Sequence, residues 1–579
     1  MKKIIPHTDI YTILGYEEIC GLKQKPFFWF VMKLSVWFPE IINNIIFYWI
    51  NKFEPREMVG FSSCWNMVCQ TADIKEYSSQ CNIDLIKTRL IRSTIQNKIP
   101  VVRDSILYFI IFAILANIDG KNSITGKSNV KNSKKFYKSL LLINSRLNNL
   151  KANPEHDFLK DIVIREYPYH YIPNTTNFIF RKRIIRYWYI YTTLLKNSDL
   201  SIIKSSVKKF ETEIGISLDD YYYSVWQLYF WFLDIPQRRD KIKEFSNKGF
   251  LPHYPNTFYI RRKNFQDNRL MNCIEYLSKD ITELKKIFKD ERRKYSVNNN
   301  FYKHFQSIFD NPVFCIDDDN YCIIDLKFLI DGICSGLQWR LQESTPDKRK
   351  EIKSEYGFLL EKYFIFLIQQ MFSGVEITNN IEDSPDAVLE TKKHILLFEF
   401  TTEYYRFVSL YNSNSLLLKE DLYKILLCRK DEIQKARGKK VEGKLLRLNH
   451  YVEKYKSTNK KIIPVLVTEN YLGDFDMLNK FDDVLNKGVE QLKLFNLKDN
   501  KPLFICLDDL EVAWGLFKRG GMANNLIQRI EQWNESNNKG AYHFNFGYFL
   551  SKNSSGKIKN GKFRNFFSQN NFLKAIKTL

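Results

Sequence analysis

The fold of this chain is decided by the stretch Ser384-Pro-Asp-Ala-Val-Leu-Glu-Thr-Lys-Lys-His-Ile-Leu-Leu-Phe-Glu-Phe-Thr-Thr402. Two apolar runs, residues 387–389 and 395–400, flank a charged break at residues 391–394. Apolar runs on both sides of a short polar break are typical of a β-hairpin. Pro385 lies at the start of the first run, where a strand accepts a proline. The sequence therefore predicts two antiparallel strands joined by a tight turn.

A symmetric turn centred between Lys392 and Lys393 would place Asp386 opposite Glu399 on one face of the hairpin. Directly opposed residues have Cβ atoms about 5 Å apart, and Thr401 shares the face because side chains alternate along a strand. Two carboxylates at that distance repel each other, which raises the pKa of one unless a cation lies between them. A hard divalent cation such as Mg²⁺ suits a sparse oxygen site of this kind. A β-bulge in the hairpin would shift the pair out of register.

This pattern has a counterpart in a known superfamily. Pro385-Asp386, twelve residues, and then Glu399-Phe400-Thr401 resemble the core motif of the PD-(D/E)xK nucleases, which include restriction enzymes and phage-defence effectors. The resemblance implies that Asp386 and Glu399 hold Mg²⁺ or Mn²⁺ together with the backbone carbonyl of Phe400. Thr401 stands where the family usually has a lysine, a position that some of its restriction enzymes vary. A threonine hydroxyl can orient water but carries no positive charge, so a lysine from elsewhere is expected.

The elements around the hairpin follow the order of that nuclease core. Residues 355–372 have the apolar spacing of an amphipathic helix. In the resembled family such a helix often contributes an acidic residue to the metal site, here Glu361; a solvated surface position is the alternative. A long helical stretch at residues 416–456 comes next, followed by apolar strands at 461–468 and 501–507. Strands without alternation are typical of an α/β sheet that is covered on both faces.

Basic residues are dense beside the proposed carboxylates, and positive side chains next to metal ligands are what a nuclease needs to hold phosphates. In the helical stretch the expected phosphate contacts are Lys419, Lys424, Arg429 and Lys435. Lys419 or Lys424 is expected to replace the missing lysine of the motif. Farther upstream, Arg181, Arg183 and Arg186 lie beside a run of tyrosine and tryptophan residues. Such a run can grip phosphates and stack on bases, or it can pack as a core.

Composition narrows the classes of protein. At 579 residues the chain is too long for one core, and 44% hydrophobic residues support packed domains rather than disorder. A net charge of +23 indicates a polyanionic partner, although a general lysine-rich bias accounts for part of it. Ten cysteines without CxxC pairs indicate free thiols in a reducing cytoplasm. The apolar stretches 26–50 and 105–117 are interrupted or too short to span a membrane.

We therefore expect a multidomain protein with a mainly α-helical N-terminal half and a C-terminal α/β restriction-endonuclease-like domain with a mixed central sheet. The expected parts are a helical region for recognition or regulation (residues 1–310), a β-hairpin and helix connector (311–345), the nuclease domain (346–530) and a basic C-terminal extension (531–579). The expected activity is Mg²⁺-dependent hydrolysis of phosphodiester bonds, of double-stranded DNA before RNA, in restriction or anti-phage defence.

Two alternatives remain open. One is a degenerate nuclease fold that binds nucleic acid as part of a complex without cutting it. The other is a membrane-surface protein whose aromatic N-terminal half inserts into a bilayer interface. The sequence also leaves open whether the protein acts as a homodimer or with partner subunits.

Overall fold

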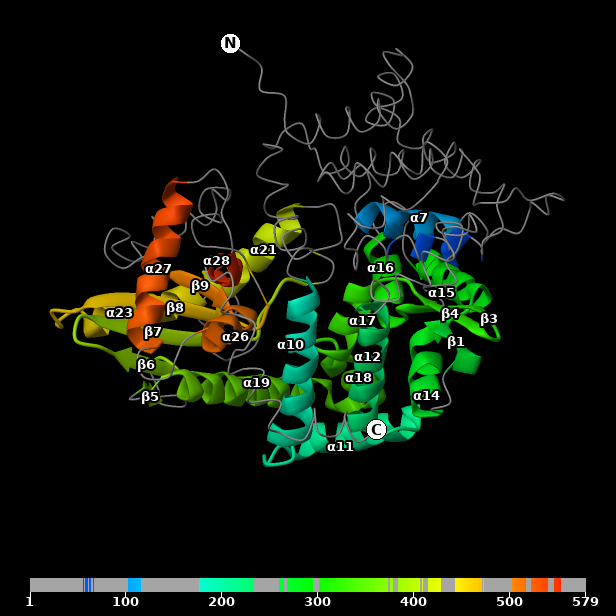
Figure 1. Ribbon diagram of the computed structural model, residues 1–579, viewed down its shortest axis with the longest axis horizontal. Coiled ribbons are helices and arrows are strands. Elements are labelled where there is room, and N and C mark those ends of the chain that lie inside the picture. Colours follow the sequence, from blue (N-terminus) through cyan, green and yellow to red (C-terminus); the bar gives the residue numbers. More distant parts are fainter. Residues whose placement is uncertain are drawn as a thin grey trace, which may run out of the picture. The chain divides into compact units, whose positions relative to one another are not determined.

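The computed structural model describes part of the chain, namely residues 56, 58–60, 62–63, 66, 103–115, 176–233, 260–264, 268–294, 301–372, 375–377, 384–406, 409, 415–427, 443–470, 472, 502–516, 522–539 and 546–552. The chain divides into two compact units, each described by itself. Unit 1 comprises residues 1–159, 211–337 and 411–413, and unit 2 comprises residues 160–210, 338–410 and 414–579. Helices predominate, and the strands form two mixed sheets, one in each unit (Figure 1).

Unit 1 contains a small four-stranded sheet in the order β1-β4-β3-β2. Its strands are β1 (Ile260–Arg261), β2 (Ser278–Lys279), β3 (Val313–Asp317) and β4 (Asn320–Ile323). Its helices are α7 (Arg103–Leu115), α12 (Leu218–Leu233), η4 (Arg262–Asn264), α14 (Asn268–Leu277), α15 (Ile281–Lys294), α16 (Phe301–Asp310) and α17 (Leu326–Ile333). Strands β3 and β4 form a β-hairpin within residues 311–345, where the sequence predicts a hairpin and helix connector.

The region before residue 310 is not purely helical. Strands β1 and β2 extend the hairpin on its two edges, β1 against β4 and β2 against β3. Each has only two residues, too few to give a periodic signal in the sequence. Helix α7 covers most of the second apolar stretch, and six of its apolar side chains are buried, namely Leu107, Phe109, Ile110, Ile111, Ala113 and Ile114. Within the described ranges no helix combines the length and apolar character needed to cross a bilayer; residues 26–50 lie outside those ranges.

Unit 2 is built on a five-stranded sheet in the order β5-β6-β7-β8-β9. Its strands are β5 (Val375–Ile377), β6 (Ala387–Glu390), β7 (His394–Thr401), β8 (Lys461–Thr468) and β9 (Leu503–Cys506). The first three are antiparallel neighbours, while β7, β8 and β9 run parallel. The predicted hairpin and both later strands are confirmed, within two residues at each end.

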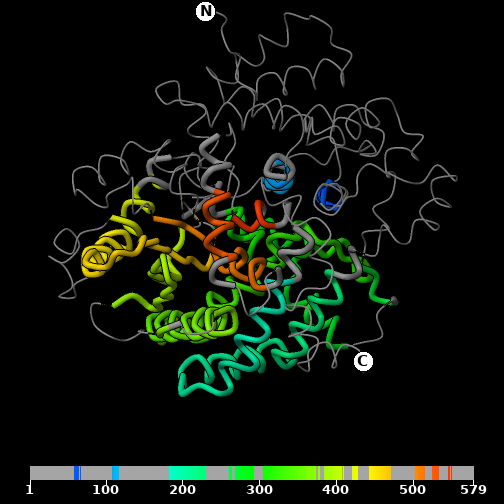
Figure 2. Tube along the Cα trace, turned by 60° about the vertical axis from the view of Figure 1, so that its left-hand side comes forward, coloured from blue at the N-terminus to red at the C-terminus, as the bar shows by residue number. Residues whose placement is uncertain are grey.

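Helices cover both faces of this sheet (Figures 1 and 2). Helix α19 (Arg349–Met371) packs on one face, where Phe364 stacks on Phe400 with ring centroids 5.1 Å apart. Helices α21 (Ser415–Leu426) and α23 (Lys444–Tyr455) share a core with Leu397 on the other face. Because side chains alternate along β7, Glu399 and Thr401 lie on the α23 face.

The remaining helices of unit 2 are α10 (Thr176–Tyr189), η2 (Ile190–Leu194), η6 (Pro346–Lys348), α26 (Leu507–Leu516), α27 (Met522–Lys539) and α28 (Phe546–Lys552). Helices α11 (Ser201–Ile214) and α18 (Leu337–Ser344) cross a unit boundary. The region assigned to a basic extension therefore begins with helices: Trp533 of α27 packs on Phe546 of α28, and Asp509 accepts a hydrogen bond from Gly547 N at 2.7 Å. The basic tail beyond Lys552 lies outside the described residues.

Candidate carboxylate site on the five-stranded sheet

The hairpin register brings the two predicted carboxylates together. Strand β6 pairs with β7 from Ala387–Phe398 through Glu390–Ile395 without a bulge, so each pair of numbers sums to the same value. One step farther along this register, Asp386 lies opposite Glu399. The predicted register is confirmed, and it depends on the turn closed by Thr391 N, which donates to the His394 carbonyl at 2.8 Å.

Asp386 is a partly buried carboxylate just before β6. Its Oδ2 accepts a hydrogen bond from Phe400 N at 2.6 Å, which locks it to the end of β7. Burial and the negative charge of Glu399 raise the pKa of Asp386 to about 7, and Glu361 adds to the shift. Burial and a second carboxylate therefore both disfavour the charged form of Asp386, and a further cation beside it would lower that pKa again.

Glu399 is fully buried, and its two oxygens have different surroundings. Its Oε1 lies 3.0 Å from Lys444 Nζ and 3.1 Å from Arg447 Nη1. Its Oε2 has no hydrogen-bond partner among the described residues. A buried charged oxygen without a partner costs more free energy than a lost hydrogen bond usually does. The Oε2 atom is thus the point at which this arrangement is incomplete.

Helix α23 supplies both cations. Gly443 precedes the helix in an extended conformation, so Lys444 is its first residue. Lys444, Arg447 and Tyr451 follow at i, i+3 and i+7, which places them along one face of the helix. A lysine in the first turn opposes the helix dipole, and the ion pair with Glu399 offsets this. A local rule broken in this way is expected at functional sites.

Tyr451 holds the arginine. Its hydroxyl oxygen accepts hydrogen bonds from Arg447 Nη2 at 3.0 Å and from Arg447 Nε at 3.2 Å. Burial and the charge of Glu399 raise the pKa of Tyr451 to about 12, so the phenol is neutral at physiological pH. It orients the guanidinium without adding charge.

Thr401 and Glu361 complete the set of predicted site residues. The Thr401 hydroxyl accepts a hydrogen bond from Glu403 N at 3.1 Å, so it closes the turn after β7. Glu361 affects Asp386 through its charge. Among the residues that the structure describes, no three histidine, cysteine or acidic side chains converge as a metal-binding group. A cation here would therefore be held by two carboxylates and backbone or solvent oxygens.

Of the two predicted substitutes for the motif lysine, Lys424 does not take that place. Lys424 is exposed on α21 and, within the described ranges, contacts neither carboxylate, whereas Lys444 reaches Glu399 and lies 3.4 Å from the Phe400 carbonyl. Lys419 also lies in α21. The two other expected phosphate contacts, Arg429 and Lys435, lie outside the described residues.

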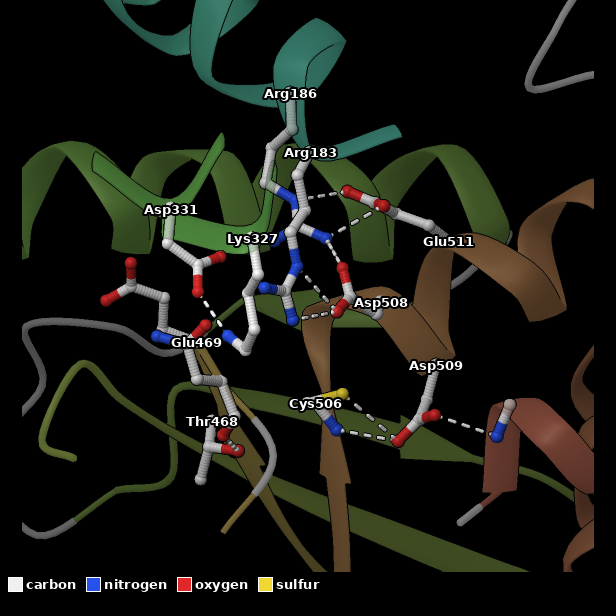
Figure 3. Close-up of polar contacts among 12 residues, drawn as sticks. Arg183, Arg186, Lys327, Asp331, Thr468, Glu469, Cys506, Asp508, Asp509 and Glu511 are labelled. Carbon is white, nitrogen blue, oxygen red and sulfur yellow. Dashed lines mark hydrogen bonds and ion pairs between the residues drawn. The ribbon is translucent and has the colours of Figure 1, made fainter. Parts of the chain in front are cut away.

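Two of the three upstream arginines are not on the surface. Arg183 and Arg186 of α10 are buried and point to Asp508 and Glu511 of α26, which together form the buried charge cluster (Figure 3). Arg183 Nη2 lies 2.7 Å from Asp508 Oδ2, and Arg186 Nε lies 2.5 Å from Glu511 Oε1. Burial alone would raise the pKa of Asp508, but the two arginines outweigh it and lower that pKa. The prediction of phosphate contacts at Arg183 and Arg186 is therefore corrected; Arg181 lies in the same helix.

Tyrosines of the aromatic run complete this buried network. Tyr187 and Tyr356 both donate hydrogen bonds to Glu469, the residue that follows β8. Tyr363 donates to Glu511 at 2.7 Å. Burial raises the pKa of Glu469, and the two phenols partly compensate. The run of aromatic and basic residues on α10 thus packs as a core, the second of the two interpretations that the sequence allowed.

Arg447 was not predicted, although a signal for it exists in the sequence. Leu445, Leu448 and Val452 form the apolar face of α23. The next face along the helix then carries Lys444 and Arg447, which the position of Gly443 as a helix start would have shown.

In comparisons with known proteins, no family model, no curated protein and no solved structure matches the chain.

Proposed function

We propose that the candidate site, formed by Asp386, Glu399, Lys444 and Arg447, hydrolyses phosphodiester bonds with the help of a divalent metal ion. Its substrate in this proposal is DNA, and the protein is an endonuclease of the PD-(D/E)xK type. The observation that carries the proposal is the Oε2 atom of Glu399, a buried carboxylate oxygen with no partner in the described part of the chain. Both protein cations fall on the other oxygen, so a further cation has an open ligand atom.

The donor set fits Mg²⁺ or Mn²⁺. Both ions prefer oxygen ligands, and Mg²⁺ usually takes one or two carboxylates and leaves the other positions to water and phosphate. Asp386 and Glu399 would provide the carboxylates, and the Phe400 carbonyl a neutral oxygen. When bound, the ion lowers the pKa of a water ligand and stabilises the negative charge that develops on phosphorus.

The protein's own residues supply the rest of the chemistry. Lys444 brings the positive charge that Thr401 lacks, and its ammonium group lies between Glu399 and the Phe400 carbonyl. From there it can polarise the attacking water or neutralise a phosphate oxygen. Thr401 supports the site indirectly, because its hydroxyl fixes the turn that follows β7.

A catalytically inert nucleic-acid-binding module is the second candidate. The observation that favours it is charge balance: Lys444 and Arg447 already supply two positive charges for the two carboxylates of the pair. A site that is neutral without metal does not require one. In that case the carboxylates would hold the basic residues in place for phosphate binding and no bond would be cut.

Thermal unfolding and plasmid nicking test the two candidates together. The full chain is heated in EDTA, Mg²⁺ or Mn²⁺, since a ligand bound only by the native state stabilises it. We expect a metal-dependent rise of roughly 5 °C in wild type at saturating metal, and none in Glu399→Gln or Asp386→Asn. Nicking of supercoiled DNA should fall at least about 100-fold in both variants.

Asp421→Asn is the matched control, because Asp421 is also a buried carboxylate paired with an arginine, Arg406, in unit 2. It should keep both the metal response and the nicking. Nicking that persists in Glu399→Gln would point to another site or a contaminant. A wild type without metal response or cleavage, on DNA and on RNA, would favour the binding module.

The proposed compartment is the cytoplasm. Cys315, Cys322 and Cys506 are free thiols in the described part of the chain, which supports a reducing environment.

A further inference from the structure

We propose that Arg447 is a substrate-contacting residue that binds a DNA phosphate next to the carboxylates, and that Tyr451 is the positioning residue that keeps its guanidinium ready for it. The inference rests on the proposed function, because it assigns the phosphate contact of the same site. Arg447 binds the substrate in this proposal, whereas Lys444 supplies positive charge at the reacting centre.

Exposure separates the two cations of α23. The side chain of Lys444 is 18% exposed and that of Arg447 is 37% exposed, although both lie on the same oxygen of Glu399. Arg447 is thus the outer of the two, and a polyanion approaching the site would meet it first. A guanidinium also offers a flat fork of five N–H groups that matches two phosphate oxygens at once.

The contacts of Arg447 leave part of this fork for a ligand. Its Nε and Nη2 donate to one acceptor, the Tyr451 hydroxyl, and its Nη1 lies against Glu399. With two donors on a single oxygen, the side chain is fixed in direction without being saturated, since an arginine has five N–H groups. Preorganisation of this kind lowers the entropy that the side chain loses when a phosphate binds.

Glu399 gives the arginine a partner in the free protein. The carboxylate accepts contacts from both cations on Oε1, so Lys444 alone still satisfies that oxygen when Arg447 turns to a phosphate. Tyr451 stays neutral and buried, and its hydroxyl remains within reach of the arginine during such a turn. When Arg447 moves from Glu399 to a phosphate, Glu399 Oε1 therefore keeps its contact with Lys444.

Duplex binding without cleavage tests the proposal. A fluorescent double-stranded DNA oligonucleotide is titrated with the full chain in EDTA at several salt concentrations. Arg447→Ala should weaken binding roughly tenfold and reduce the slope of log affinity against log salt by about one. Arg447→Lys should keep most of the slope and lose part of the affinity, because an ammonium lacks the planar fork. Tyr451→Phe should weaken affinity several-fold with the slope unchanged, since no charge is removed.

Arg529→Lys and Arg529→Ala are the matched controls, because Arg529 is an arginine on helix α27 of the same unit and is hydrogen-bonded to Gln532. Both should bind DNA like wild type. Full affinity and full slope in Arg447→Ala would overturn the proposal, and so would equal losses in the Arg529 variants. A loss seen with single-stranded RNA but not with duplex DNA would overturn the choice of ligand.

Failure here and failure of the nuclease proposal give different results. If wild type cuts DNA and Arg447→Ala binds and cuts equally well, the phosphate contact is wrong while the nuclease stands. If wild type never cuts but Arg447→Ala loses one unit of salt slope, the phosphate contact stands on a binding module. Melting temperatures of each variant exclude unfolding, and Arg447→Lys keeps the measurement decisive if the alanine variant is unstable.

Discussion

The candidate site and the buried charge cluster are made of the same kinds of side chain, but their surroundings differ. In the cluster, Arg186 is completely buried and binds both Asp508 and Glu511. In the candidate site, Arg447 is partly exposed and shares one oxygen of Glu399 with Lys444. The cluster is closed to any ligand, whereas the candidate site has an arginine at its rim.

The two regions also differ in the kind of buried polar atom that lacks a hydrogen-bond partner. Among the described residues, the cluster has a donor without a partner, Arg186 Nη1, whereas the candidate site has an acceptor without one, Glu399 Oε2. Both atoms are buried, and an open donor would need an anion as its partner. A carboxylate oxygen beside a second carboxylate, in contrast, is a ligand atom for a cation. The candidate site thus differs from the structural cluster in the exposure of its arginine and in having an acceptor, rather than a donor, without a partner. Both regions contain arginines and carboxylates, so the types of charged residue do not distinguish them.

The largest expected effect tests the closed state of the cluster. Arg186→Met leaves two buried carboxylates short of a partner, so the free energy of unfolding should fall by about 3–5 kcal/mol. Arg447→Met is the matched change in the candidate site, and it should cost about 1 kcal/mol or less, since the arginine is part-exposed and Lys444 stays. Urea unfolding of the full chain measures both.

DNA binding by the folded variants should show the reverse order, with a loss in Arg447→Met and none in Arg186→Met. If Arg186→Met instead remained stable and lost affinity for DNA, α10 would be a nucleic-acid surface, as its sequence first indicated, and the contrast between the two regions would break down.

Lys182 sharpens the comparison, because it is a lysine buried next to the same cluster. Burial lowers its pKa to about 8, although Glu511 and Asp508 act in the opposite direction. The unfolded chain keeps this proton up to about pH 10.5, so between pH 8 and 10.5 the unfolded state binds more protons and stability rises with pH. Below pH 8 the charge is buried at a cost of roughly 3 kcal/mol.

Lys182→Met removes that cost, so at pH 7 the variant should be more stable than wild type by up to about 3 kcal/mol. The difference should shrink as the pH rises from about 8 and vanish near 10.5. Unfolding by urea at a series of pH values checks this. A variant less stable than wild type at pH 7 would mean that the lysine stabilises the cluster as a third cation.

The hairpin was predictable because both its register and its faces follow from local rules. The apolar runs end at a polar break, and the sums of opposed residue numbers fix Asp386 against Glu399. Strand β8 was equally clear, since an uninterrupted apolar run of strand length between polar residues is typical of a sheet covered on both faces.

The cations could not be assigned in the same way. Lys419, Lys424 and Lys444 all follow the hairpin in the sequence, and the choice among them depends on where the chain returns to the sheet. Residues 428–442, between α21 and α23, have no pattern that fixes this return. The prediction of phosphate contacts on α10 was wrong for a different reason. The acidic partners of its arginines, Asp508 and Glu511, lie more than three hundred residues away, so the local sequence indicates an exposed basic face.

The smallest expected effect concerns Thr401, the position at which the sequence departs most from the nuclease motif. If the candidate site belonged to a degenerate nuclease that lost activity with its motif lysine, Thr401→Lys would restore cutting. Lys444 already places an ammonium 3.0 Å from Glu399 Oε1, so a second lysine adds repulsion and removes the hydrogen bond from Glu403 N. We expect nicking to fall only several-fold, which corresponds to the roughly 1 kcal/mol of one lost hydrogen bond.

The exchange of the two residues gives the decisive version of this test. Lys444→Thr should reduce nicking about 100-fold, in line with the loss of one charged group that stabilises the transition state. Adding Thr401→Lys to Lys444→Thr returns an ammonium to the carboxylates from the strand, so the double variant should exceed Lys444→Thr even though Thr401→Lys alone is harmful. A coupling of this sign is expected when two positions serve one electrostatic role. Should the two losses simply add, Lys444 would be a structural partner of Glu399, and the positive charge for catalysis would have to come from elsewhere.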